Sequence, residues 1–142
     1  MHEILFKAKR IDNGEWVEGY LFETQENTYI VYNNQFDDDL FLSPSNIFIV
    51  VDANTICQYT GLTDKNGCKI WEGDVCDRHE KYPEIVKYRQ GDYVLDYSYA
   101  FGKDSGFNYC NLGFYVCERG CVEVIGNIFD NPELLEAGEA NE

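Results

Sequence analysis

The stretch from Cys57 to Val75, CQYTGLTDKNGCKIWEGDV, alternates short apolar segments with turn residues. Its DKNG segment predicts a tight turn, because Asn66 and Gly67 tolerate the positive φ values that such turns require. A second turn is predicted at Gly73, and a strand follows from Val75. Short strands joined by tight turns favour an antiparallel β structure. The residues to which we assign a structural role in these turns or in the core are Gly61, Asn66, Gly67, Trp71, Gly73 and Asp74.

The chain before this stretch also predicts strands. Ile4–Ile11 leads into an Asn-Gly pair at 13–14, and such a pair between β-rich segments is a strong hairpin signal. Thr28–Tyr32 and Ile47–Val51 are rich in β-branched and aromatic residues, which favours strands over helices. Residues 1–52 therefore predict one small antiparallel β unit, and the polar segment Asp52–Thr55 predicts the joint to the next unit.

The chain after this joint predicts a second β unit over residues 56–135. Its expected strands beyond Val75 are Glu84–Arg89, Tyr93–Tyr97, Leu112–Cys117 and Val122–Phe129. Asn131 predicts the N-cap of a short C-terminal helix, because Pro132 and Glu133 follow it. Residues 136–142 predict a frayed acidic tail. The expected fold class is all-β, with two small barrel-like β units and a short C-terminal helix.

The composition of the 142-residue chain argues against several classes of protein. Lys and Arg number 11 against 26 Asp and Glu, which gives a net charge of −15. We therefore expect no direct binding to nucleic acid phosphates or to anionic membranes. A hydrophobic content of 44% argues against intrinsic disorder. The first ten residues lack the apolar block of a signal peptide, and no apolar run approaches a membrane span, so we expect a cytoplasmic protein.

Six cysteines raise the questions of disulfides, metal binding and nucleophilic catalysis. They are Cys57, Cys68, Cys76, Cys110, Cys117 and Cys121. Reduced thiols are expected inside a cell. Cys76 with His79, and Cys117 with Cys121, could supply four zinc ligands, but we favour small buried thiols. Neither histidine, His2 or His79, lies in a recognisable catalytic Cys/His constellation, so we expect no catalytic residue, and we expect no metal and no cofactor.

Three acidic residues of the opening stretch are candidates for a carboxylate cluster. They are Asp64, Glu72 and Asp74, and a metal site or acid–base chemistry could use such a group. Their spacing does not match a calcium-binding loop. Turn chemistry explains them more simply, because Asp side chains accept hydrogen bonds from nearby backbone N–H groups in turns.

A Gly-rich segment near the C-terminal end of the chain concentrates aromatic residues. It contains Tyr97, Tyr99, Phe101, Phe107 and Tyr109. Tyrosine is favoured at protein interfaces, since it offers a large contact area with few rotatable bonds. These five rings therefore predict a protein-interaction surface, and the alternative is that they fill the β unit and its loop.

Two separated blocks of the sequence resemble the YopX-like family of phage and prophage proteins. The first is QYTGL at 58–62 with DKNG at 64–67 and IWEGDV at 70–75, and the second is VIGNI at 124–128 with NPELL at 131–135. The opening FKAK at 6–9, leading into Trp16, fits as well. Trp71 stands where a Tyr or Phe is usual, and the cysteines are not a family feature.

The resemblance implies an all-β protein of phage or prophage origin, with two small barrel-like units and no established catalytic activity. The Gly-Asp-Val sequence at 73–75 also begins a strand in many SH3-like barrels, so the second unit is expected to be SH3-like, by analogy of fold alone. The resemblance supplies no functional residues.

Three functions remain open on this basis. The first is a non-enzymatic phage or prophage protein that acts through protein–protein contacts, either as a homo-oligomer or with a host or phage protein. The second is an acidic nucleic-acid mimic that inhibits a host DNA-binding protein or nuclease, with a surface beginning at Asp37, Asp38 and Asp39. The third, a small metal-dependent enzyme, requires the carboxylates or thiols above to converge.

Overall fold

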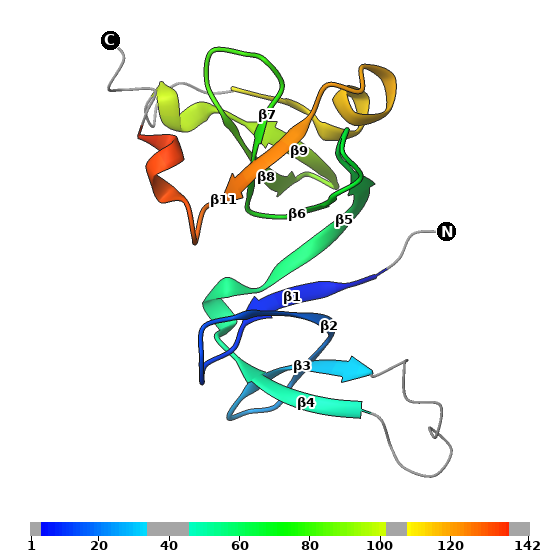
Figure 1. The fold of residues 1–142 in the computed structure, drawn as a ribbon, viewed down its shortest axis with the longest axis vertical. Helices are drawn as coiled ribbons and strands as arrows, with labels where there is room; N and C mark the ends of the chain where they lie inside the picture. The colour runs from blue at the N-terminus through cyan, green and yellow to red at the C-terminus, as the bar shows by residue number, and fades with distance from the viewer. Residues whose placement is uncertain (1–3, 34–45, 102–107, 137–142) are drawn as a thin grey trace. The chain divides into compact units, whose positions relative to one another are not determined.

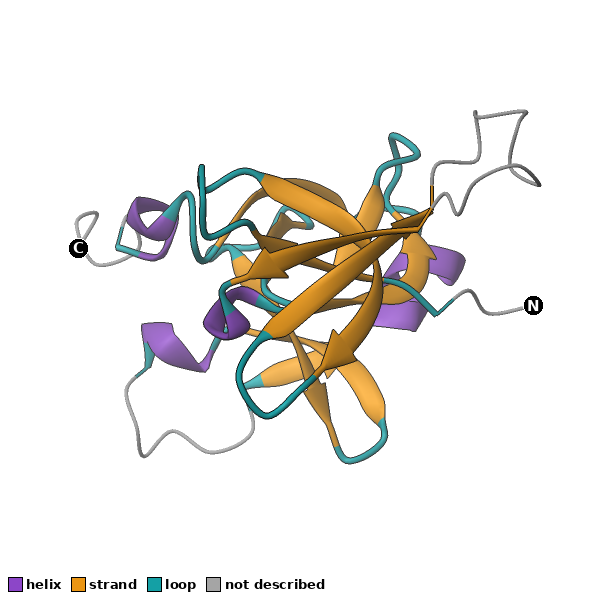
Figure 2. Ribbon diagram, turned by 90° about the horizontal axis from the view of Figure 1, so that it is seen from below, coloured by secondary structure: helices purple, strands orange, loops and turns teal. Residues whose placement is uncertain are grey.

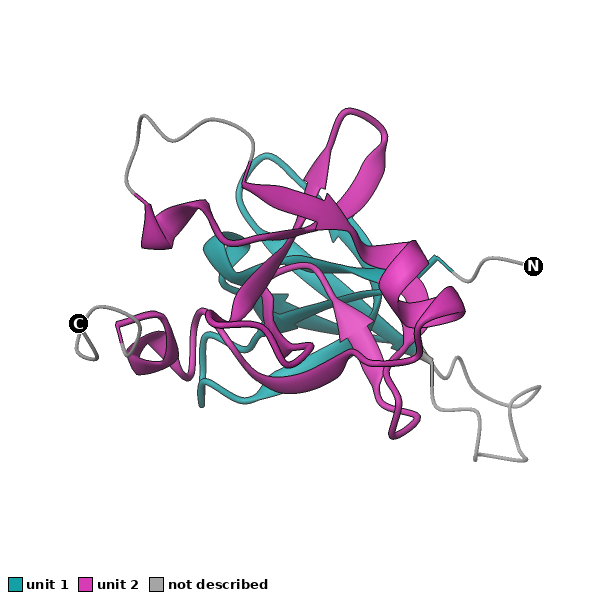
Figure 3. Cartoon of the chain, turned by 90° about the horizontal axis from the view of Figure 1, so that it is seen from above, with its two compact units in different colours: residues 1–59 teal, residues 60–142 magenta. Residues whose placement is uncertain are grey.

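The computed structural model describes residues 4–33, 46–101 and 108–136 of the chain. Strands dominate its secondary structure (Figure 2). The chain divides into two compact units, Met1–Tyr59 and Thr60–Glu142 (Figure 3). The segment that the sequence marks as the joint, Asp52–Thr55, contains the short 3-10 helix η1 (Ala53–Thr55) of the first unit, and strand β5 (Cys57–Thr63) then runs across the division.

The first unit is built on four antiparallel strands, drawn in blue to cyan-green in Figure 1. They are β1 (Phe6–Lys9), β2 (Trp16–Glu23), β3 (Thr28–Asn33) and β4 (Asn46–Val51). The sheet order is β4-β3-β2-β1, with the start of β5 beside β1. Alternation along these strands directs Ala8, Ile30 and Val51 into a small core, since successive strand residues point to opposite faces.

The barrel shape that the sequence suggests for this unit is not confirmed. Within the described residues, the strand pairs form an open sheet and no complete ladder joins its edges. A single isolated bridge links Arg10 to Val51, and the Asp52 N–H donates to the Lys9 carbonyl oxygen at 2.8 Å. The edges therefore meet at one end only.

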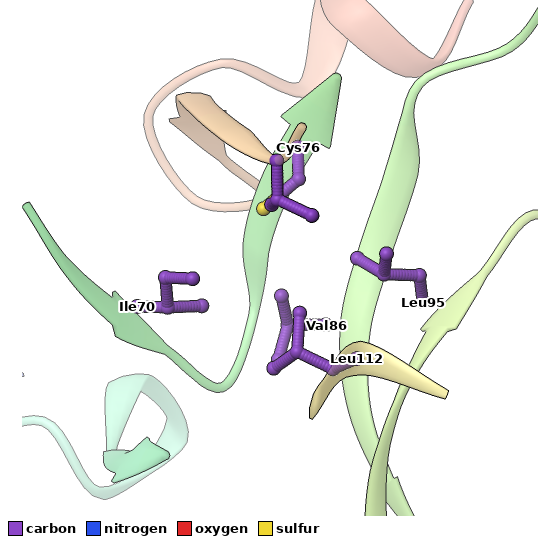
Figure 4. Close-up of a cluster of buried hydrophobic side chains, with 6 residues drawn as sticks. Ile70, Cys76, Val86, Leu95 and Leu112 are labelled. Atoms are coloured by element: carbon purple, nitrogen blue, oxygen red, sulfur yellow. The ribbon is translucent and has the colours of Figure 1, made fainter. Parts of the chain in front are cut away.

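The second unit contains the remaining strands. They are β6 (Lys69–Trp71), β7 (Asp74–Asp77), β8 (Glu84–Arg89), β9 (Asp92–Asp96), β10 (Tyr109–Asn111) and β11 (Glu123–Asn127). β6 pairs with β5, and the other five form an antiparallel sheet in the order β10-β9-β8-β7-β11. This sheet is also open over the described residues, so the SH3-like barrel is not confirmed either. Its core gathers six buried side chains (Figure 4): Ile70, Cys76, Val86, Leu95, Leu112 and Val122.

The predicted strand Leu112–Cys117 is wrong, because this segment is helical. A helical turn begins at Leu112 and continues as the π-helix η3 (Phe114–Glu118). The side-chain oxygen of Asn111 accepts a hydrogen bond from the Phe114 N–H at 2.7 Å, which caps the turn. A short apolar run does not distinguish a strand from a buried helix, and here the cap and the burial of Leu112 decide for the helix.

The C-terminal helix is present as a single 3-10 turn, η4 (Pro132–Leu135), with Pro132 at its start. Asn131 occupies the N-cap position, as predicted, but its side chain makes no capping hydrogen bond. Its side-chain oxygen instead accepts a hydrogen bond from the Asn127 N–H at 3.2 Å, so Asn131 closes the turn after β11. Residues 137–142 of the predicted tail lie outside the described residues.

Replacing Gly67 with valine is expected to lower the free energy of unfolding by about 1–2 kcal/mol. Gly67 has a φ of +84°, the left-handed region that a β-branched residue adopts only under strain. A Cβ atom at this position would meet no atom within 4 Å, so the whole cost comes from the backbone. Denaturant unfolding followed by circular dichroism measures it.

The matched control for this turn is Gly67→Asn. Asparagine enters the left-handed region far more readily than valine, so this variant is expected to keep most of the stability. Equal unfolding free energies for wild type and Gly67→Val would refute the proposed role of the turn conformation.

Candidate functional site

The carboxylate of Asp64 holds a turn and a strand together rather than lying free in a cluster. One of its oxygens accepts hydrogen bonds from the N–H groups of Asn66 and Cys68, both at 2.9 Å, and the other from the Val124 N–H at 2.9 Å. Burial raises the pKa of Asp64, but the three backbone hydrogen bonds outweigh burial and leave the pKa below its usual value. Asp64 thus ties the DKNG turn to β11.

Trp71, Gly73 and Asp74 lie around the turn that precedes β7, whereas Gly61 lies within β5. Asp74 accepts a hydrogen bond from the Trp71 N–H at 2.8 Å, and the indole-bearing Trp71 is 4% exposed. Gly73 donates its N–H to the Val86 carbonyl oxygen at 2.8 Å. Gly61 and Gly73 both have positive φ, +88° and +90°. Gly61 and Gly73 therefore provide backbone conformations that favour glycine, Asp74 fixes the turn, and Trp71 belongs to the buried core.

The five predicted interaction aromatics do not share one environment. Tyr97 and Tyr99 are half-buried, and the Tyr99 hydroxyl donates to the Pro83 carbonyl oxygen at 2.9 Å. Tyr109 is half-buried beneath the Arg89 guanidinium, 4.7 Å from the ring centroid. Phe101 is 53% exposed. Phe107 lies outside the described residues, as do the acidic residues 37–39 of the mimic hypothesis.

Two of these aromatics help to line a pocket of about 250 Å³ in the second unit. Phe101 lies between two tyrosines, with its ring centroid 5.4 Å from that of Tyr82 and 6.2 Å from that of Tyr97. Both contacts are edge-to-face, the geometry that aromatic pairs favour. Tyr97 and Phe101, which follow β9, and Tyr82, from the connection between β7 and β8, thus form one aromatic wall of the pocket.

A buried ion pair lines the same pocket. The guanidinium of Arg78 donates from Nε and Nη2 to the two carboxylate oxygens of Glu84, at 2.7 and 3.1 Å. The Glu84 side chain is 2% exposed, and the Arg78 guanidinium also lies 4.3 Å from the Tyr115 ring centroid. Burial raises the pKa of Glu84, and the Arg78 hydrogen bonds oppose that rise. The positive charge of Arg78 and the negative charge of Glu84 therefore compensate each other.

The rim of the pocket is more exposed and carries one charge of each sign. Glu80 approaches Arg78 at 3.4 Å, and the ammonium of Lys81 lies 5.4 Å from the centroid of the Tyr82 ring. Both residues belong to the connection between β7 and β8. The pocket thus presents aromatic surface beside an outward carboxylate and an outward ammonium.

Sequence reasoning missed Arg78, Tyr82 and Glu84. One signal for Glu84 was present, because it lies two residues before Val86 in a strand and so shares the core-facing side with it. An acid at such a position needs a cation, and Arg78 is six residues earlier across a turn. Arg78 could not be identified as the cation that pairs with Glu84 without the geometry of the turn between them.

Metal and thiol chemistry receive no support from the described part of the chain. No group of three or more His, Cys, Asp or Glu side chains in it could hold a metal ion. Burial raises the pKa of the Cys110 thiol to about 11, and it raises that of Cys76 further. A thiol with a raised pKa supplies little of the thiolate that nucleophilic attack and metal binding require. In the same ranges, no helix has the length and apolar character needed to cross a membrane.

Comparison with known proteins relates the chain to solved structures and to a protein family. It is similar to protein EF1440 from Enterococcus faecalis, with 25% sequence identity and a TM-score of 0.55 over 95% of this chain and 99% of that protein. A comparison with curated proteins gives no match. The family model described as YopX protein matches residues 5–136, and the chain therefore belongs to the YopX family.

Proposed function

We propose that this protein is a non-enzymatic phage or prophage protein of the bacterial cytoplasm that acts through protein–protein contacts, and that the aromatic pocket of its second unit receives a side chain of the partner. The observation that carries the proposal is the position of Phe101, half-exposed between Tyr82 and Tyr97 over a buried ion pair. Aromatic rings around a pocket are typical of the residues that dominate protein–protein binding energy.

The charges of the pocket support binding more than catalysis. A general acid or base must exchange a proton with a substrate, whereas both oxygens of Glu84 are occupied by Arg78. The volume of about 250 Å³ is also small, because pockets for small-molecule ligands usually enclose about 300–1,000 Å³. A single side chain of a protein fits such a pocket better than a cofactor.

The expected occupant is a lysine or arginine side chain. Aromatic faces attract cations, and the exposed Glu80 carboxylate at the rim adds a negative charge beside them. The chain as a whole carries −15, which attracts a basic partner surface over a distance.

Replacing Phe101 with alanine is expected to weaken partner binding more than about tenfold, because truncating a central aromatic contact commonly has this effect. The full chain is used to purify partners from cells that carry the phage or prophage, and the affinity of each purified partner is then measured. Circular dichroism verifies that the variant is folded.

Phe114→Ala is the matched control, since Phe114 is also an exposed phenylalanine of the second unit but does not line the pocket. Tyr82→Ala provides a second pocket variant and should weaken binding as well. Partners that bind wild type, Phe101→Ala and Tyr82→Ala with equal affinity would reject the pocket as the contact site.

A further inference from the structure

The outer face of the first unit carries two rows of apolar residues. Strand register aligns Tyr20 with Val31 and Val31 with Phe48, and it aligns Phe22 with Tyr29 and Tyr29 with Val50. Alternation places these six residues on the side opposite Leu21, Ile30 and Ile49. We refer to the six as the apolar face: Tyr20, Phe22, Tyr29, Val31, Phe48 and Val50.

The apolar face is exposed and already organised. Tyr20 and Phe48 are 56% and 55% exposed, and Phe22 and Val50 are exposed as well. The rings of Phe22, Tyr29 and Phe48 contact one another, with centroids 5.7 to 6.1 Å apart. A contiguous exposed apolar patch of this kind usually marks an interaction site.

We propose that a second copy of this chain packs on the apolar face and forms a homodimer. None of the six residues is charged, whereas the chain as a whole carries −15. A two-fold contact places the same patch on both partners, so a charged patch would repel itself while an apolar patch is self-complementary. A basic partner, in contrast, would gain little from these six residues, because the acidic residue that shares their side of β2, Glu18, lies outside the patch and opposite Lys7.

The exposed area is sufficient for such a contact. A half-exposed ring leaves about 100 Å² accessible, so four rings and two valines offer roughly 500 Å² per copy. Two faces together reach about 1,000 Å², the lower limit of a specific interface. A hollow of about 360 Å³ borders Phe48 and Val50, but Arg10 and Asp12 also line it, so it is not counted in this area.

This inference goes beyond the proposed function, because it concerns the first unit and the pocket lies in the second. The test is sedimentation velocity of the full chain over a hundredfold range of concentration, at low and at moderate salt. The expected result is a concentration-dependent dimer that is tighter at moderate salt, since salt screens the repulsion between two chains of like charge.

The matched variants are Tyr20→Glu and Tyr88→Glu. Both tyrosines are 56% exposed and lie on strands, Tyr20 on the apolar face and Tyr88 on β8 of the second unit. Each variant adds the same charge, so an effect of net charge alone changes both equally. Tyr20→Glu is expected to raise the dimer Kd at least tenfold, and Tyr88→Glu to leave it unchanged.

Phe48→Ala is a second variant for the case in which Tyr20→Glu does not fold, and it is also expected to raise the Kd. A wild-type chain that stays monomeric at every concentration and both salts overturns the proposal. A dimer whose Kd is unaffected by both Tyr20→Glu and Phe48→Ala overturns it too. Partner binding by the pocket is measured separately with the Phe101 variant, so either proposal can fail alone.

Discussion

Trp71→Ala is expected to lower the free energy of unfolding of the second unit by about 3–5 kcal/mol. The Trp71 side chain is 4% exposed at the end of β6, so its removal leaves a cavity as well as losing buried apolar surface. The turn after it is fixed by the hydrogen bond from the Trp71 N–H to Asp74, which alanine keeps. The loss therefore measures the packing of the indole. Denaturant unfolding by circular dichroism quantifies it.

One further substitution and one native reporter sharpen this measurement. Trp71→Phe keeps most of the aromatic volume and is expected to cost much less than alanine. Trp16, the only other tryptophan, lies half-exposed in the first unit and still reports the unfolding of that unit by fluorescence in Trp71→Ala. An unfolding free energy for Trp71→Ala equal to that of wild type would show that Trp71 is not a core anchor.

The strands could be predicted where the local pattern agrees with the tertiary structure. Thr28–Tyr32 and Ile47–Val51 both form strands and pair with each other, but the continuous apolar run of the second predicts a buried strand, whereas Ile47, Phe48 and Val50 are exposed. The segment from Leu112 to Cys117 misled the prediction because its helical turn depends on a side-chain cap from Asn111. Such a cap is a local signal, but the β-rich composition of the segment outweighed it.

The candidate site was only half predictable. The aromatic segment indicated Tyr97 and Phe101, and both line the pocket. Arg78, Tyr82 and Glu84 belong to a different part of the chain. Arg78 reaches Glu84 only because the chain reverses direction between β7 and β8. A sequence pattern shows which residues are aromatic or charged. It does not show which residues, distant in the sequence, become neighbours when the chain turns.

Arg78→Met is expected to lower the free energy of unfolding by about 3–5 kcal/mol at neutral pH, because it leaves the Glu84 carboxylate buried without its cation. Methionine retains much of the apolar stem, so the change removes the guanidinium with its ion pair to Glu84 and its contact with the Tyr115 ring. The double variant Arg78→Met with Glu84→Leu is expected to recover most of the stability. Removing both charges of a buried pair is commonly near neutral.

The pH dependence of Arg78→Met gives an independent test of the same pair. Burial already raises the pKa of Glu84, and without Arg78 that pKa rises further above its value in the unfolded chain. The folded state then binds a proton that the unfolded state has released, so the loss of stability relative to wild type is smallest at acidic pH and grows as the pH rises through the folded pKa. Denaturant unfolding of Arg78→Met between acidic and neutral pH measures this slope.

Arg89→Met is the matched control, because Arg89 also contacts a buried carboxylate, that of Asp96, at 3.2 Å. Asp96 keeps two hydrogen bonds from Ser98 after this change, and these bonds outweigh burial and hold its pKa below its usual value. Arg89 is also the more exposed arginine, so its loss should cost about 1 kcal/mol or less and produce no gain in stability at acidic pH. Equal losses for the two arginine variants, or an Arg78→Met loss relative to wild type that does not shrink on acidification, would contradict a buried Glu84 that needs the Arg78 cation.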